Sequence, residues 1–334
     1  RNALDLAAQQ WTVSSDEEQQ ALGYFLMDWL SDDEHIALHT SGSTGKPKEI
    51  QMPKTAMYAS AVRTAAFFNL SEGDSALLCL PIRYIAGKMM LVRALVLGLH
   101  LDIIPPKTKL TIEKDYTFAA LIPLQANASF DVLGRFKTVL IGGAPIPTDL
   151  RKRISKKYKH CIETYGMTET LTHVATRIVS DAVIPFKVMP GIGIATDEND
   201  CLVLEVPYLP LSPLVTQDVV RLEGRDSFRL FGRRDWVINS GGMKIFPEAL
   251  EEVLTPFIKF PFFFTALPDA NLGEQLVLLV EAPATEKTAI MAIAQQHLGA
   301  NKHHIPKQVI CMDAFMHTHS GKLDRKATIK RLHM

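Results

Sequence analysis

The chain has 334 residues, 47% of them hydrophobic and 22% charged, which is typical of a globular protein with core enough for two domains. Its 36 Lys and Arg residues balance 36 Asp and Glu residues, so no excess charge favours nucleic acid or an acidic membrane as a partner. We therefore expect small-molecule substrates. Four scattered cysteines without a C-x-x-C pair, and no signal peptide, favour the cytoplasm; a homodimer is left open.

The first half of the chain alternates between helical and strand-like segments. An amphipathic helix is predicted over residues 15–30, where Ser15 and Glu18 have capping-box spacing. The run MMLVRALVLGL predicts a buried helix, interrupted by Arg93 and too short to span a bilayer. The alternation predicts an α/β fold with a mostly parallel sheet, with strands at residues 35–40, 75–80, 101–105, 117–123 and 138–143 and helices at 52–70 and 146–158.

The pattern changes twice in the second half. From about residue 172 to 232, β-type segments broken by Pro and Gly predict a small antiparallel subdomain. After Asp235, helical segments at 244–254 and 288–298 and strand-like segments at 261–268 and 275–283 predict a second α/β domain. We expect a large domain over residues 1–234 and a small mobile one over residues 235–334.

The segment TSGSTGKPK, residues 40–48, crowds glycines, hydroxyls and lysines after an apolar run. Glycine lets the backbone approach phosphate oxygens, hydroxyls donate hydrogen bonds and lysine supplies charge, so the loop suits a pyrophosphate or triphosphate. It is not a P-loop, because Pro47 follows Gly45-Lys46 and Thr40 replaces the first glycine. A surface hairpin between two strands is the alternative interpretation.

Five further segments, in one order, resemble the AMP-forming acyl- and aryl-CoA synthetases, as does TSGSTGKPK itself. They are IGGAPIP, YGMTET, TQDVVRL, GRRDWVINSGGMKIFPEALE and SGKLDRK. Within this superfamily, YGMTET with SGG and I-x-P-E-x-L-E is most similar to the o-succinylbenzoate-CoA ligases of menaquinone biosynthesis. The resemblance implies adenylation of a carboxylic acid with ATP and Mg²⁺, followed by acyl transfer to CoA.

The resemblance also implies roles for individual residues. Lys322 and Thr168 would act at the α-phosphate, and Glu169 would bind Mg²⁺, for which a carboxylate oxygen is suited. Asp218 would accept from the ribose hydroxyls and Arg233 would donate to the ribose and phosphate side. The remaining nucleotide-binding residues would be Thr40, Ser41, Gly42, Ser43, Thr44, Gly45 and Lys48 at the β- and γ-phosphates, and Gly142, Gly143, Ala144, Tyr165 and Gly166 around adenine.

The acid and CoA sites have weaker markers. Arg83, Lys88 and His173 are candidates to contact a dianionic acid, although surface or core positions would explain them equally. Asp235 is the expected hinge, and Gly241 and Gly242 would line the pantetheine tunnel, where a side chain would obstruct. Zinc is not expected, because no suitably spaced cysteine or carboxylate accompanies the histidines 297, 303, 304, 317 and 319.

Two features depart from the family. Only about 38 residues precede the phosphate loop, so one lobe of the large domain is expected to be shortened. Trp236 and Asn239 alter the neighbours of the hinge. An enzyme that loads a carrier-protein thiol, and a non-catalytic nucleotide-binding relative, therefore remain as alternative functions.

Overall fold

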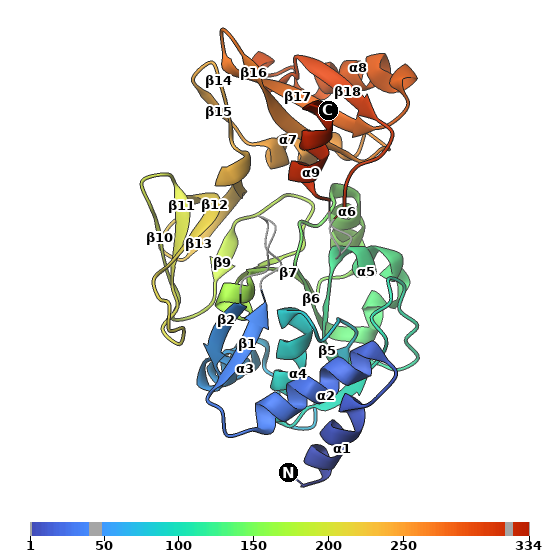
Figure 1. Ribbon diagram of the computed structural model, residues 1–334, viewed down its shortest axis with the longest axis vertical. Coiled ribbons are helices and arrows are strands. Elements are labelled where there is room, and N and C mark those ends of the chain that lie inside the picture. The colour runs from blue at the N-terminus through green and yellow to red at the C-terminus, as the bar shows by residue number, and fades with distance from the viewer. Residues whose placement is uncertain (1, 40–48, 318–322, 334) are drawn as a thin grey trace. The chain divides into compact units, whose positions relative to one another are not determined.

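A computed structural model describes residues 2–39, 49–317 and 323–333 (Figure 1). It divides into two compact units. The first comprises Arg1–Asp197, Val203–Thr216 and Leu222–Arg229, and the second comprises Glu198–Leu202, Gln217–Arg221 and Leu230–Met334. The domain boundary expected near Asp235 stays a prediction.

Two helices and a hairpin open the chain. Helix α1 (Asn2–Thr12) packs on α2 (Glu17–Leu30). Asp16, rather than Ser15, is the N-cap of α2, because its carboxylate accepts the Gln19 N–H at 2.8 Å. Strands β1 (His35–His39) and β2 (Glu49–Pro53) then pair antiparallel in a sheet of their own, so β1 does not join the parallel sheet.

The centre of the first unit is a parallel sheet, which confirms the expected α/β fold. Its order is β7-β6-β5-β3-β4, and each neighbouring pair runs parallel. The strands are β3 (Ser75–Leu78), β4 (His100–Ile103), β5 (Tyr116–Leu121), β6 (Phe136–Ile141) and β7 (Cys161–Gly166). All are short, and except for the edge strand β4 they are rich in buried apolar residues, as expected for strands covered on both faces.

Helices cover both faces of this sheet (Figure 1). Leu150 and Ile154 of α6 (Thr148–Lys157) and Ala126 of α5 (Pro123–Ala128) pack with one face, which includes Val139 and Ile141. The other face contacts α3 and α4, since Phe68 of α3 (Lys54–Phe68) and Arg93 of α4 (Ile85–Leu97) both lie against the Phe118 ring. Helices therefore support both faces of the sheet.

Antiparallel strands follow, as the sequence predicted. Beyond β7 the sheet continues through β8 (His173–Ile178), β9 (Phe186–Val188) and β13 (Ser227–Arg233), each pairing antiparallel with its neighbour. The complete order is β10-β11-β12-β13-β9-β8-β7-β6-β5-β3-β4, with β10 (Gly193–Thr196), β11 (Cys201–Glu205) and β12 (Leu214–Leu222) as the remaining strands.

The second unit has its own sheet and core. Strands β14 (Ile238–Ser240), β15 (Met243–Ile245), β16 (Phe262–Asp269), β17 (Gly273–Glu281) and β18 (Gln308–Met312) form it. Buried residues of α7 (Pro247–Leu254) and α8 (Lys287–Leu298) share a core with β17. Ile329 of α9 (Arg325–Lys330) packs with Phe263, Leu279 and Phe315 in a second cluster.

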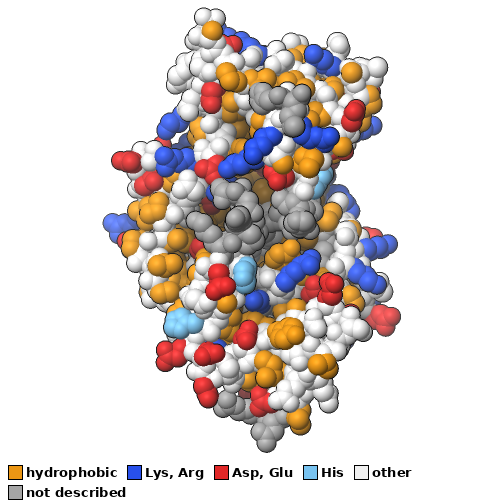
Figure 2. Space-filling view, in the orientation of Figure 1, with side chains coloured by type: hydrophobic (Ala, Val, Ile, Leu, Met, Phe, Trp, Pro, Cys, Tyr) orange, Lys and Arg blue, Asp and Glu red, His pale blue; other side chains and the backbone are white. Residues whose placement is uncertain are grey.

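The surface carries both charges. Figure 2 shows Lys and Arg interspersed with Asp and Glu over the visible face, in keeping with the equal numbers of each in the sequence. Among the described residues, the helices are all too short or too polar to cross a membrane.

We predict that Gly87→Ala destabilises the protein although Ala is the better helix former. A Cβ at this position of α4 would lie 2.3 Å from the Pro81 carbonyl oxygen, and overpacking against backbone costs roughly 1 to 3 kcal/mol. The free energy of unfolding from urea titration measures the loss. As a control, Ala86→Gly at the exposed neighbouring position should cost about 1 kcal/mol from helix propensity alone. An increase in stability in Gly87→Ala would contradict the close approach.

Candidate active site

The loops after β6 and β7 begin side by side, because these strands are parallel neighbours. Gly142 follows β6 directly, and a Cβ there would lie 2.3 Å from Oγ1 of Thr164 on β7. Gly143 has φ +81°, a conformation that favours glycine, and both Gly143 and Ala144 are exposed. This stretch is therefore exposed, and its assignment to adenine stays a prediction.

A tight turn after β7 carries the two residues assigned to the α-phosphate and the metal. The Thr170 hydroxyl accepts the Met167 N–H at 2.9 Å and donates to the Thr172 carbonyl at 2.8 Å. Between these contacts, the short helix Thr168–Thr170 leaves Thr168 and Glu169 half-buried. Gly166 is required at the start of the turn, since a Cβ would lie 2.3 Å from the Thr172 carbonyl oxygen.

Tyr165, the residue assigned to the adenine face, belongs to an aromatic cluster. Its ring is T-shaped to Phe228 at 5.2 Å and tilted to Phe186 at 5.9 Å, and the residue is only 8% exposed. The cluster fixes the orientation of the ring. A core aromatic residue would pack in the same way, so the contact of Tyr165 with adenine stays a prediction.

In the second unit, the residues assigned to the ribose and the hinge form a chain of ion pairs. Arg233 lies 3.8 Å from the Asp218 carboxylate and 3.6 Å from that of Asp235. Asp218 is 9% exposed, and the Arg233 Nε is buried without a hydrogen-bond partner in the described part of the chain. A ligand with hydroxyl or phosphate oxygens would find one more donor here.

The hairpin assigned to the pantetheine tunnel is built on two glycines. Gly241 and Gly242 connect β14 to β15 with φ values of +59° and +79°, which the turn requires. The Gly241 N–H donates to the Leu272 carbonyl at 2.9 Å. A cavity of about 240 Å³ lies next to this hairpin, lined by Ser240, Leu272, Leu276, Lys302, His303, Ile305 and Lys307.

The three candidates for the acid site differ in their contacts and in their exposure. Lys88 lies 5.4 Å from the centre of the Phe25 ring of α2, and burial lowers its pKa. Arg83 is exposed and stacks over its neighbour Tyr84 at 5.2 Å. His173, in contrast, is 7% exposed at the start of β8.

Arg93 lies close to His173 in the structure, although no sequence motif assigned it to a ligand. The Arg93 guanidinium donates to the Thr172 hydroxyl, which is 3.1 Å from Nδ1 of His173. Burial lowers the pKa of Arg93 to about 10, so it stays charged at neutral pH, and burial and this charge lower the pKa of His173 well below 6.5. A charged group inside the apolar run MMLVRALVLGL was the signal that could have marked Arg93.

Arg93 has no counter-ion in the described part of the chain. It and Arg151 are the two buried arginines there, and Arg151 pairs with Glu163 at 2.6 Å. Arg93 contacts the Met90 sulfur, the Thr172 hydroxyl and the Phe118 ring, and its Nε has no partner. Nε2 of His173 is likewise buried and unpartnered within the described residues. Nε of Arg93 and Nε2 of His173 are thus two buried polar atoms that have no hydrogen-bond partner among the described residues.

Two assigned groups lie outside the described residues. They are the phosphate-loop residues Thr40, Ser41, Gly42, Ser43, Thr44, Gly45 and Lys48, and the lysine Lys322. Within the described ranges, no cluster of three or more His, Cys, Asp or Glu residues could hold a metal ion. Magnesium commonly needs only one or two protein carboxylates beside phosphate oxygens, so Glu169 remains a suitable ligand.

Comparison with known proteins decides the family. The model of the family described as AMP-binding enzyme matches residues 4–213. The chain belongs to this family of AMP-binding enzymes. A solved acyl-CoA synthetase (AMP-forming)/AMP-acid ligase II-like protein from Dyadobacter fermentans is 32% identical, with a TM-score of 0.62 over 98% of both chains.

More distant relatives of this AMP-binding enzyme carry a more specific name. A 2-succinylbenzoate–CoA ligase from Listeria monocytogenes is 24% identical over 88% of this chain and 69% of its own length. A probable 2-succinylbenzoate–CoA ligase from Mycobacterium tuberculosis is 27% identical over 90% and 85%. The O-succinylbenzoate coenzyme A synthetase of Bacillus subtilis, solved with ATP and magnesium ion, shares the fold with a TM-score of 0.75 at 20% identity, over 88% and 69%.

We predict that His173 makes the protein less stable in acid. The unfolded chain binds a proton at this residue below about pH 6.5 and the folded protein does not, so the stability present above pH 6.5 is lost as pH falls towards the lower folded pKa. Between pH 7 and 5.5, His173→Asn should lose about 1 kcal/mol less free energy of unfolding than the wild type. Urea titrations at several pH values measure this, with the exposed His100→Asn as control. Parallel pH profiles for wild type and His173→Asn would contradict the prediction.

Proposed function

We propose that this AMP-binding enzyme is an AMP-forming acid-CoA ligase. It joins a carboxylic acid to the AMP part of ATP and releases pyrophosphate; the CoA thiol then displaces AMP to give the thioester. The observation that carries the proposal is the pair of loops at the ends of β6 and β7, which expose the Gly143–Ala144 backbone and hold Glu169 half-buried in a chain of this family. The relatives named 2-succinylbenzoate–CoA ligase support it over 88–90% of the chain.

In the first half-reaction, a carboxylate oxygen of the acid attacks the α-phosphorus and the bond to pyrophosphate breaks. Negative charge accumulates around the α-phosphate, so the protein must supply donors and cations there. The Thr168 hydroxyl donates to the α-phosphate, and Lys322 bridges it to the acid carboxylate. Glu169 holds Mg²⁺, which neutralises phosphate charge when bound. The β- and γ-phosphates are held by Thr40, Ser41, Gly42, Ser43, Thr44, Gly45 and Lys48.

The nucleoside is held through its base and through its ribose. Tyr165, Gly166 and the backbone of Gly142 to Ala144 receive the adenine. Asp218 accepts from the ribose hydroxyls, which suits a carboxylate with two oxygens, and the free Nε of Arg233 donates to the ribose and phosphate side. The ion pair between Asp218 and Arg233 holds both side chains in place before ATP binds.

In the second half-reaction, the CoA thiol attacks the acyl carbon and AMP leaves. Gly241 and Gly242 leave room for the pantetheine arm, because a Cβ on Gly242 would meet nothing within 4 Å. The neighbouring cavity brings Lys302, His303 and Lys307 together, and such a lining suits the phosphates of free CoA. This favours CoA over the thiol of a carrier protein. Asp235 serves as the hinge between the large domain and the small domain of residues 235–334.

For the acid we propose o-succinylbenzoate, with Arg93 and His173 at its aromatic carboxylate. A substrate with a second carboxylate needs a cation in the pocket, because an unpaired buried charge is costly. The Thr172 hydroxyl accepts from Arg93 and can direct its proton to Nδ1 of His173. His173 then carries its own proton on Nε2, so Nε2–H and the Arg93 Nε–H, which have no acceptor among the described residues, can both donate to the substrate. Arg83 and Lys88 remain weaker candidates, as each already packs on an aromatic ring.

The cytoplasm remains the proposed location, supported by four free cysteines, three of them buried. A homodimer stays a prediction.

We predict that the enzyme splits ATP into AMP and pyrophosphate in the presence of o-succinylbenzoate and CoA.

Lys322→Ala should nearly abolish formation of the adenylate but spare thioester formation from a supplied acyl-adenylate, since its charge is needed only at the α-phosphate. Pyrophosphate release and thioester yield measure the two half-reactions separately. ADP as the main product would reject the proposed reaction, and ATP binding without turnover of any acid would favour the non-catalytic alternative. Adenylation followed by transfer to a carrier protein but not to CoA would favour the carrier-protein enzyme.

We predict that Arg93→Met raises KM for o-succinylbenzoate by roughly ten- to a hundredfold with little change in KM for ATP. The range corresponds to about 1.5 to 3 kcal/mol for a hydrogen bond to a charged group. 3-Benzoylpropanoate, which lacks the aromatic carboxylate, separates this contact from general damage because it should respond little to the variant. Arg135→Met, at an exposed ion pair with Asp115, is the matched control, and Arg83→Met tests the competing candidate. Equal losses with both acids would rule out a contact to the aromatic carboxylate.

A further inference from the structure

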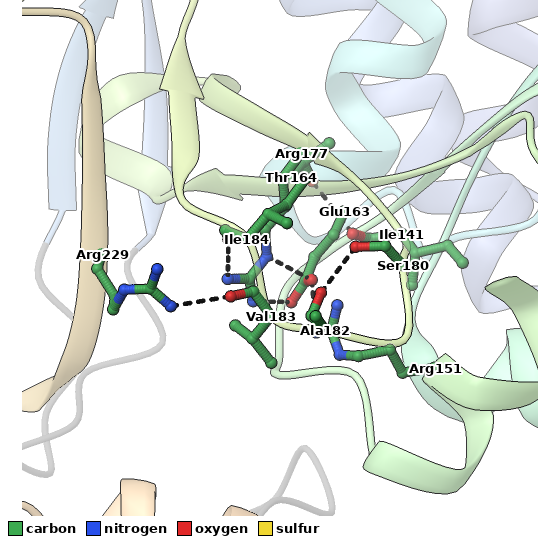
Figure 3. Close-up of polar contacts among 10 residues, drawn as sticks. All are labelled: Ile141, Arg151, Glu163, Thr164, Arg177, Ser180, Ala182, Val183, Ile184 and Arg229. Atoms are coloured by element: carbon green, nitrogen blue, oxygen red, sulfur yellow. Dashed lines mark hydrogen bonds and ion pairs between the residues drawn. The ribbon is translucent and has the colours of Figure 1, made fainter. Parts of the chain in front are cut away.

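A buried carboxylate joins three elements of the first unit (Figure 3). Oε2 of Glu163 on β7 accepts from Arg151 of α6 at 2.6 Å and from Nε of Arg177 on β8 at 2.7 Å. Oε1 accepts from a second nitrogen of Arg177 at 3.0 Å. Glu163 is 3% exposed and Arg151 is 1% exposed. We call these three residues the Glu163 cluster.

The Glu163 cluster is connected to the ring of Tyr165 through one intermediate side chain. Glu163 and Tyr165 lie two residues apart on β7, so their side chains share a face of the strand. The Arg177 guanidinium lies 4.0 Å from the centre of the Phe186 ring, and that ring packs against Tyr165. Arg177 is also the residue opposite Glu163 in the β7–β8 register. A change at the carboxylate is thereby passed to the aromatic cluster.

The same carboxylate restrains the other side of the proposed adenine site. Arg151 lies in the first turn of α6, seven residues after the exposed Ala144. Its bond to Glu163 therefore ties the segment after β6 to strand β7. Arg177 further donates to the Ile184 carbonyl at 3.0 Å and so holds the connection between β8 and β9, as Figure 3 shows. Glu163 is the carboxylate that both arginines share.

Stability alone does not account for such a cluster. A buried ion pair seldom stabilises a fold more than apolar residues of similar volume would, because both ions are desolvated. Here two guanidinium groups share one carboxylate, and Nε and Nη1 of Arg151 have no hydrogen-bond partner within the described residues. What the arrangement does provide is fixed geometry, since a guanidinium binds a carboxylate through directed hydrogen bonds.

We propose that Glu163 is a positioning residue for adenine recognition. Through Arg177 and Phe186 it sets the orientation of Tyr165, and through Arg151 it sets the position of the Gly142–Ala144 backbone. It touches neither ATP nor the acid. The inference rests on the proposed function, because it concerns the affinity for ATP.

The test is Glu163→Gln, which keeps the shape of the side chain and removes its charge. We expect the Kd for the non-hydrolysable analogue α,β-methylene-ATP, measured by calorimetry, to rise about tenfold, with a similar rise in KM for ATP. KM for the acid and for CoA should not change. Arg177→Lys keeps the charge but loses the paired hydrogen bonds and the stack on Phe186, so it should weaken nucleotide binding in the same direction even if Glu163→Gln folds poorly.

The control is Asp102→Asn. Asp102 lies on β4, at the end of the strand order, and its more exposed carboxylate pairs with Lys114 and accepts from the Tyr116 hydroxyl. The Kd of this variant for the analogue should equal that of the wild type. A purely structural role predicts a lower melting temperature in the folded Glu163 and Arg177 variants with an unchanged Kd, and this result would overturn the inference while the proposed function stands. Failure of the wild type to bind the analogue would overturn both.

Discussion

The buried carboxylate of Glu163 is the constraint on which the first unit depends. Without it, two guanidinium groups would lie inside the protein with no anion, at a cost of several kcal/mol each. Its strand, β7, is also the last parallel strand, and β8 turns back antiparallel beside it. The chain therefore changes direction at the strand that carries Tyr165 and leads into Glu169, and the ion pairs hold this reversal in one geometry.

Local signals in the sequence were sufficient to predict much of the fold. Short apolar strands between glycine or proline turns marked the parallel sheet, and periodic apolar residues marked α2, α6 and α8. Glycines and hydroxyls marked residues 40–48 as a phosphate loop, which lies outside the described residues, whereas the loops after β6 and β7 were assigned from the family resemblance. Errors arose where neighbouring residues compete: Asp16 and Ser15 are both good N-caps, and only the backbone conformation selects Asp16.

Contacts between residues far apart in the sequence could not be predicted from these local signals. Arg93 and Thr172 are 79 positions apart in the sequence, so the motif YGMTET gave no hint of a buried cation beside it. The side chains that bind Glu163 come likewise from two other elements, α6 and β8. A single sequence shows that Arg93 is unusual in its helix, yet whether its partner is a protein carboxylate or a ligand depends on the fold. The two arginines buried in the described part of the chain illustrate both outcomes, as Arg151 has an internal anion and Arg93 has none among the described residues.

The burial of the cysteines matters for an enzyme that makes an activated acyl group. An acyl-adenylate reacts with any accessible thiolate, including those of the protein that formed it. Cys79, Cys161 and Cys201 are completely buried, and burial raises the pKa of Cys79 and Cys161 to about 12. These thiols stay protonated at neutral pH and are poor nucleophiles. In the first unit, self-acylation at Cys79 or Cys161 is thereby suppressed, so neither of these thiols competes with the incoming thiol substrate for the activated acid.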